Sequence, residues 1–210
     1  PYFTVFIRLL RLAAFFLTML LPGYYVAVVT FHPERIPRVL LPDFLGSVAA
    51  TPLSAMGEAL VLFLLYELLR EAGLRLPDAI GHTLSVVGGI VIGDAIVTAG
   101  LVGLPMIIII ALTAVGAFAV PSLYEPITIL RFLFILIGGL LGLFGMVLGF
   151  LLLVVNLCSL HTLGIPLTAP IAPWQSGALR DTFRRSGWRR LGQEDYNISS
   201  ARQCEGEADR

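Results

Sequence analysis

The sequence has little charge, no lysine and only two cysteines, and each shortage narrows the kinds of protein it encodes. Only 13% of the residues are charged and 57% are hydrophobic, whereas about a quarter of the residues of a soluble domain are charged. This composition predicts an integral membrane protein. All 14 basic residues are arginine and 14 acids balance them, so the composition does not support nucleic-acid binding.

The chain also lacks the short motifs that mark catalytic or metal sites. Cys158 ends an apolar run and Cys204 lies in a polar tail, and their spacing fits no metal site. Nucleophile elbows and phosphate loops are missing. Ser85 lies three residues after His82, but no further residue completes a catalytic triad. We therefore expect no catalytic activity, no metal and no cofactor.

Long apolar runs predict an all-α, polytopic membrane bundle with four spanning helices. The first covers residues 5–29, with a kink expected at Pro22 and Gly23. The second covers residues 79–99, and a short turn leads to the third, which ends near residue 120. The last runs from Ile127 to about Leu157. It would be roughly 46 Å long against a hydrocarbon core of ~30 Å, so it must tilt, kink or project beyond the membrane.

One more helix is expected over residues 52–71. Thr51 is the predicted N-cap, and Gly73 is predicted to follow the end of the helix. Its uninterrupted apolar segment is too short to cross a bilayer alone. The helix therefore lies at the interface, re-enters the membrane, or forms a fifth span.

The composition divides the chain into a membrane domain, residues 1–174, and a polar tail, residues 175–210. Arginines gather at the start of the tail, so the positive-inside rule places the tail in the cytoplasm. We expect its end to be disordered. Because the sequence starts with Pro1 and enters an apolar run at once, we interpret it as the C-terminal part of a longer protein.

Two rows of small residues follow helical spacing, and we predict that both pack against other helices. The spacing leaves open whether the partners lie in the same chain or in other copies of a homo-oligomer. The first row is Gly81, Ser85, Gly89 and Gly93, and the second is Gly138, Gly142, Gly145 and Gly149.

Asp94 is the first candidate for a functional polar residue. A carboxylate inside a spanning helix is costly, and it usually marks an ion path or a polar contact. His82 lies three turns earlier on the same face. The residues leave two interpretations open for Asp94, an ion or ligand path and a structural contact inside the bundle.

The predicted helix at 52–71 carries further charges. Glu58 forms either a buried contact between helices or an exposed group at the interface. Glu67 lies nine residues later and so points to the opposite side. Together with Arg70 and Glu71, it is predicted to form a solvated helix end.

Arg131 and Asn156 bound the second glycine row. Arg131 is close enough to the start of its helix to extend toward the interface. The alternatives are a counter-charge for Asp94 or Glu58, or a contact with phosphate. The candidates for a polar path or ligand site are therefore Asp94, His82, Glu58, Arg131 and Asn156.

Several blocks resemble the membrane domain of the GerA-type spore germination proteins, over about residues 1–190. In order they are FHPERIP, EALVLFLLYELLREAGLRLPDAIG, SVVGGIVIGDAIVTAGLV, PSLYEPITILRF and GIPLTAPIAPW. The resemblance implies the A subunit of a nutrient germinant receptor in the spore inner membrane, a bacterial cell membrane. It also implies a permease-like B subunit and a lipoprotein C subunit as partners, and assembly of A subunits, with an ion channel as one form.

Family members carry a soluble domain before the membrane part, and they often have glutamine where Asp94 stands. The residues leave two other functions open, a secondary transporter and a structural scaffold of a sporulation complex. Transporters usually show repeated halves with broken helices, and the sequence has no internal repeat.

Overall fold

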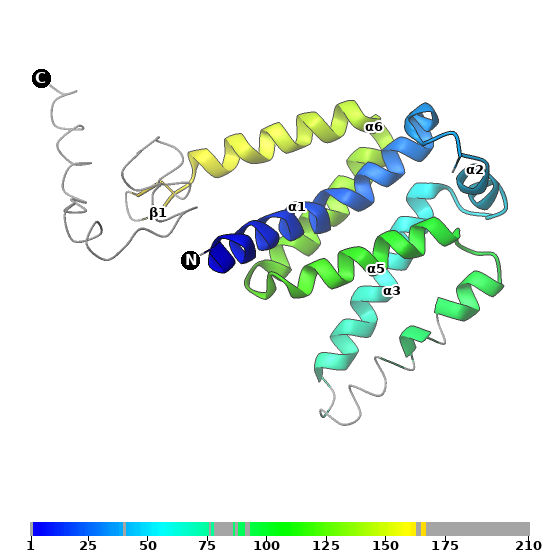
Figure 1. Ribbon diagram of the computed structural model, residues 1–210, viewed down its shortest axis with the longest axis horizontal. Coiled ribbons are helices and arrows are strands. Elements are labelled where there is room, and N and C mark those ends of the chain that lie inside the picture. Colours follow the sequence, from blue (N-terminus) through cyan, green and yellow to red (C-terminus); the bar gives the residue numbers. More distant parts are fainter. Residues whose placement is uncertain are drawn as a thin grey trace, which may run out of the picture. The chain divides into compact units, whose positions relative to one another are not determined.

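The structure, a computed structural model, describes residues 2–39, 41–75, 77, 86, 88–90, 93–162 and 165–166. The chain forms two compact units, one of Leu10–Val154 and one that combines Pro1–Leu9 with Val155–Arg210. The helices are α1 (Tyr2–Phe31), α2 (Leu41–Ala49), α3 (Ala55–Arg75), α5 (Leu104–Phe118) and α6 (Tyr124–Ser159), with short 3-10 helices at Pro33–Arg35 and Pro121–Leu123 (Figure 1). Two short strands, β1 (His161–Thr162) and β2 (Ile165–Pro166), pair antiparallel.

Two helical segments of the described chain are long and apolar enough to cross a membrane, Phe3–Phe31 and Pro121–Ser159. The third predicted span corresponds to α5, whose 15 residues extend only about 22 Å. Residues 79–85, 87, 91 and 92 of the predicted span at 79–99, and all of the tail at 175–210, lie outside the described residues. The helical fold is therefore confirmed, and the count of four spans stays a prediction.

Helix α3 begins and ends later than predicted. Ser54 Oγ accepts a hydrogen bond from the Gly57 backbone N–H at 3.2 Å, which is the bond of an N-cap residue. Ser54 therefore caps the helix in place of Thr51. The predicted stop at Gly73 is also wrong, because the helix continues to Arg75.

The core of the larger unit lies where α1, α3, α5 and α6 meet. Its largest buried cluster includes Val26, Phe63, Met106 and Ile135, each 0% exposed. Between membrane helices, such contacts stabilise through close packing more than through removal of apolar surface from water.

Helices α1 and α6 touch backbone to backbone at Gly23 and Gly138. A Cβ atom on Gly23 would lie 2.5 Å from the carbonyl oxygen of Phe134, and a Cβ on Gly138 would overlap the carbonyl oxygen of Gly23. Neither position has space for a side chain. The kink expected at Pro22 and Gly23 stays a prediction, because the helix is continuous through both residues; the role of Gly23 that the structure shows is this close contact.

Helix α6 bends sharply at Gly142, where φ is 65° and ψ is −154°. This region is essentially restricted to glycine. Beyond the bend, a Cβ on Gly149 would lie 3.1 Å from Ile137 Cδ1 and 3.4 Å from Phe134 Cε1. Residues 137 and 149 would be about 18 Å apart along a straight helix, so the second arm of α6 folds back on the first (Figure 1). The sequence predicted that this long helix tilts, kinks or projects beyond the membrane, and the structure shows the kink.

Candidate functional site

Two acidic residues of α3, Glu58 and Glu67, collect polar partners from other parts of the chain. Glu58 is 0% exposed, and the Glu67 side chain is 20% exposed. Nine residues separate them, which corresponds to two and a half helical turns, so they lie on opposite sides of α3. Each therefore forms a separate polar site.

Glu58 joins the start of α3 to two neighbouring segments. The Thr51 hydroxyl donates a hydrogen bond to Glu58 Oε1, and the Gly103 backbone N–H donates to Oε2 at 3.3 Å. The first turn of a helix also favours a negative charge. Of the two interpretations left open by the sequence, the structure supports the buried contact, which fixes the loop that enters α5.

Glu67 joins α3 to the start of α6. The Tyr124 hydroxyl lies 2.8 Å from Glu67 Oε1 and 2.9 Å from Oε2, to which it donates. The Thr128 hydroxyl donates to Oε1 at 3.2 Å. We call Glu67, Arg70, Tyr124, Thr128 and Arg131 the Glu67 cluster.

Two guanidinium groups complete the Glu67 cluster. Arg131 Nη1 lies 3.7 Å from Glu67 Oε1, and Arg70 Nη1 lies 3.8 Å from Oε2. The Arg131 guanidinium also lies 4.9 Å from the ring centre of Phe63, and that of Arg70 lies 3.2 Å from the ring centre of Tyr124. Both distances allow cation–π attraction.

The structure corrects two predictions about these charges. Glu67 does not belong to a solvated helix end, because its oxygens accept hydrogen bonds from α6. Glu71 does, since it is 53% exposed and pairs with the exposed Arg75 at 2.7 Å. Arg131 does not extend to an interface, because it is 0% exposed, and its carboxylate partner is Glu67 in place of Asp94 or Glu58.

The other polar candidates are not brought together in the described residues. Asp94 is exposed within the helical residues 93–98, and His82 lies outside the described residues. Asn156 is exposed and belongs to the other compact unit, where its backbone carbonyl accepts a hydrogen bond from Ser159 Oγ at 2.8 Å. A path that combines these residues stays a prediction.

The two rows of small residues differ in their surroundings. Cβ atoms on Gly89 and Gly93 would meet none of the described residues within 4 Å, and Gly81 and Ser85 lie outside the part of the chain that the structure describes. The second row faces its own chain. Gly142 lies against Phe31 of α1, and a Cβ on Gly145 would lie 3.0 Å from Ile137 Cγ2.

Tyr124 and Thr128 were not identified from the sequence. A signal was available, because Tyr124, Thr128 and Arg131 are spaced by four and three residues and so share one face of α6. Polar residues on one face of an otherwise apolar helix predict an internal polar partner, which here is Glu67.

The connector after α1 carries an exposed pair, with His32 Nδ1 3.2 Å from Glu34 Oε1. A hydrogen bond from its own backbone N–H and then the contact with His32 hold the pKa of Glu34 below its usual value. A lowered carboxyl pKa stabilises the fold above the unfolded-state pKa, and this contribution is lost as the pH falls through the folded-state value.

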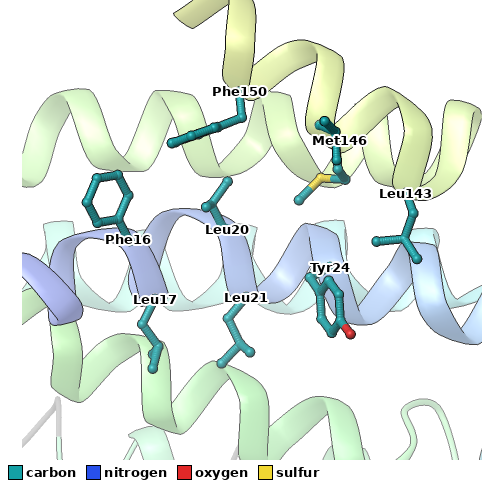
Figure 2. A pocket seen from close by; sticks show the side chains of 9 residues that line it. Phe16, Leu17, Leu20, Leu21, Tyr24, Leu143, Met146 and Phe150 are labelled. Carbon is teal, nitrogen blue, oxygen red and sulfur yellow. The ribbon is translucent and has the colours of Figure 1, made fainter. Parts of the chain in front are cut away.

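An apolar groove of about 510 Å³ lies between α1 and the second arm of α6. Figure 2 shows Phe16 and Leu20 of α1 facing Phe150 and Met146 of α6. The residues that line it are Phe16, Leu17, Leu20, Leu21, Tyr24, Leu143, Met146, Val147 and Phe150. The lining is almost entirely hydrocarbon, so the groove suits apolar contacts.

Among the described residues, no group of three His, Cys, Asp or Glu side chains could hold a metal.

Comparisons with known proteins relate the sequence to one family. The sequence model described as Bacillus/Clostridium GerA spore germination protein matches residues 1–195. Spore germination protein KA of Bacillus subtilis (strain 168) is 42% identical over 184 residues, which are 87% of this chain and 34% of that protein. Spore germination protein GerLA of Bacillus cereus is 42% identical over 169 residues, 80% of this chain and 34% of GerLA.

A further relative is named an uncharacterized membrane protein, YfkQ of Bacillus subtilis (strain 168). It is 40% identical over 184 residues, 87% of this chain and 36% of YfkQ. The chain thus spans about a third of the length of these relatives. No solved structure matches the chain at a significant level.

Proposed function

Because this chain belongs to the GerA family of spore germination proteins, we propose that it is the membrane part of the A subunit of a nutrient germinant receptor that triggers spore germination. The observation that carries the proposal is the family match over residues 1–195. The chain spans about a third of its relatives, so the activity, partners and location of the whole protein are part of the proposal.

The proposed receptor lies in the spore inner membrane and contains a permease-like B subunit and a lipoprotein C subunit. Two observations support a membrane location, the two long apolar helical segments and the name of the relative YfkQ as a membrane protein. In this proposal the subunit transmits a signal and catalyses no reaction.

Several copies of the A subunit are proposed to assemble around a path for monovalent cations. The exposed carboxylate of Asp94 supports a place on this path, because an intramembrane carboxylate favours cations and water around it. No described residue lies within 4 Å of a Cβ on Gly89 or Gly93, which leaves room for a helix of a neighbouring copy to approach.

Germination of spores tests the receptor role. The gene for the full-length protein is deleted from a spore-forming host that lacks other germinant receptors, and the spores are exposed to amino acids, sugars and nucleosides. We expect loss of cation release and then of dipicolinate release for at least one nutrient, with recovery when the gene returns. Spores that respond to every nutrient with or without the gene would contradict the receptor role and favour a scaffold.

A further inference from the structure

The Glu67 cluster carries more positive than negative charge. Arg70 and Arg131 each contribute one guanidinium, and the carboxylate of Glu67 lies 3.8 and 3.7 Å from them. Glu125, next to Tyr124 in the chain, is exposed. Because a buried charge is costly unless it is paired, the surplus positive charge favours one additional negative group.

Arg131 has unused hydrogen-bond donors. It is 0% exposed, yet none of its three side-chain nitrogens makes a hydrogen bond with the part of the chain that the structure describes. Its nearest ion-pair contact, 3.7 Å to Glu67 Oε1, is longer than a hydrogen bond. The hydroxyls of Tyr124 and Thr128 already donate to Glu67. Glu67 therefore does not satisfy the guanidinium.

From these observations we propose that the Glu67 cluster binds one oxyanion, a carboxylate or a phosphate group, between α3 and α6. A planar guanidinium donates two parallel hydrogen bonds to the oxygens of such a group. Arg131 provides this fork, and Arg70 provides the second positive charge. The proposal is independent of the receptor role.

The cluster is partly exposed. The side chain of Glu67 is 20% exposed and that of Arg70 is 31% exposed, whereas Arg131 is 0% exposed. The proposed oxyanion approaches beside the partly exposed Arg70 and adds its negative charge to that of Glu67. The oxyanion can be a free solute or the phosphate of a lipid headgroup, because both present the same oxygens.

Ligand-dependent stability of the full-length protein tests the site. The protein is purified in dodecyl maltoside, a detergent without phosphate or carboxylate, and its Tm is followed while acetate, inorganic phosphate or phosphatidylglycerol is added. Sodium chloride at equal ionic strength corrects for general salt effects. A ligand that binds only the folded state raises the Tm with increasing concentration.

For the wild type we expect acetate, phosphate or the lipid to raise the Tm beyond chloride. The rise should be absent in Arg131→Gln and retained in Arg11→Gln, a matched change at an exposed arginine of α1. A rise with acetate or phosphate indicates a free oxyanion. A rise with phosphatidylglycerol alone indicates a lipid headgroup.

If Arg131→Gln does not fold, two milder variants test whether the Glu67 cluster binds an oxyanion. Arg131→Lys keeps the charge and loses the fork, and Arg70→Gln changes a partly exposed residue. In each we expect binding to be about tenfold weaker or more, equivalent to about 1.4 kcal/mol. Unchanged affinity in both, an equal rise in Arg131→Gln, or no rise in the wild type with any probe would overturn the proposal.

Discussion

At the scale of single residues, the charges of α3 are divided by their surroundings. Glu71 pairs with Arg75 at the exposed end of the helix. Glu67, one turn earlier, is the only carboxylate within 4.0 Å of Arg131 among the described residues. Exposed ion pairs contribute little to stability, whereas removal of one partner of a buried pair leaves an uncompensated charge. Two acids of one helix are therefore expected to respond differently to mutation.

Replacing Glu67 by leucine should lower the free energy of unfolding by about 3–5 kcal/mol, because Arg131 remains buried without a counter-charge. Glu71→Leu is the matched control, and its cost should stay below about 1 kcal/mol. Both are measured by titration of the full-length protein from mild detergent into sodium dodecyl sulfate. Equal losses in the two variants would show that Arg131 does not depend on Glu67.

At the scale of elements, α6 is organised by its glycines. Gly138 meets the backbone of α1, and Gly142 forms the bend. Gly139 lies between them and faces the flexible side chain of Met56. Adjacent glycines thus have different reasons to lack a side chain, and alanine substitutions separate these reasons.

Gly138→Ala should destabilise the protein by about 1–3 kcal/mol, because the added methyl meets the backbone of Gly23 and α1 must move. Gly139→Ala should cost less, since the added methyl meets side-chain atoms of Met56 and no backbone; Sδ and Cγ can rotate away, and the Met56 Cβ at 3.0 Å must move by only a few tenths of an ångström. Thermal unfolding of the two variants in the same detergent provides the comparison. A lower Tm for Gly139→Ala than for Gly138→Ala would contradict the contact between α1 and α6.

Gly142→Ala should cost about 1–3 kcal/mol, because φ is 65° at this position and a side chain is strained there. Gly46→Ala is the control, since Gly46 is helical and an added Cβ meets none of the described residues within 4 Å, and alanine favours a helix over glycine by up to about 1 kcal/mol. The Tm should fall in the first variant and rise or stay constant in the second. A neutral Gly142→Ala would mean that α6 is straight at this point.

At the scale of the whole molecule, much apolar surface remains uncovered by the chain itself. On α5, Ile108 and Val115 are 60% and 68% exposed. Such surface suits lipid or neighbouring subunits. The proposed cation path therefore belongs to the assembled receptor, and its tests require the full-length protein.

Asp94→Leu should reduce cation flux through liposomes that contain the assembled receptor. If removal of the carboxylate raises the free-energy barrier to cation passage by only about 1.4 kcal/mol, the rate of passage falls tenfold. Glu125→Gln removes an exposed carboxylate at the start of α6 and should leave the flux unchanged. Flux that is indifferent to Asp94→Leu would remove Asp94 from the path.

Assembly is tested at Gly89. Leucine there should abolish crosslinking between copies, because the bulky side chain fills the open space that a neighbouring helix is proposed to use. Gly46→Leu adds the same bulk at an open position of α2 and should leave crosslinking intact. Gly142→Leu would not distinguish a loss of assembly from a loss of stability, since it strains the bend of α6 inside its own chain. Undiminished crosslinking in Gly89→Leu would exclude this row from the interface.

The sequence by itself determined the helical class, the two long apolar helices and the family resemblance. These properties depend on local composition, on periodicity and on ordered blocks of residues. It also indicated that Glu58 and Glu67 lie on opposite sides of their helix, because that follows from helical geometry alone.

Only the tertiary structure decided which partners these residues have. Tyr124 lies 57 positions after Glu67 in the chain, and helical spacing does not relate two separate helices. The same holds for the bond from Gly103 to Glu58. The sequence allowed a tilt, a projection or a bend in α6, and the positive φ of Gly142 produces the bend. Glycine permits this backbone conformation, and the packing of the two arms of α6 against each other and against α1 favours it.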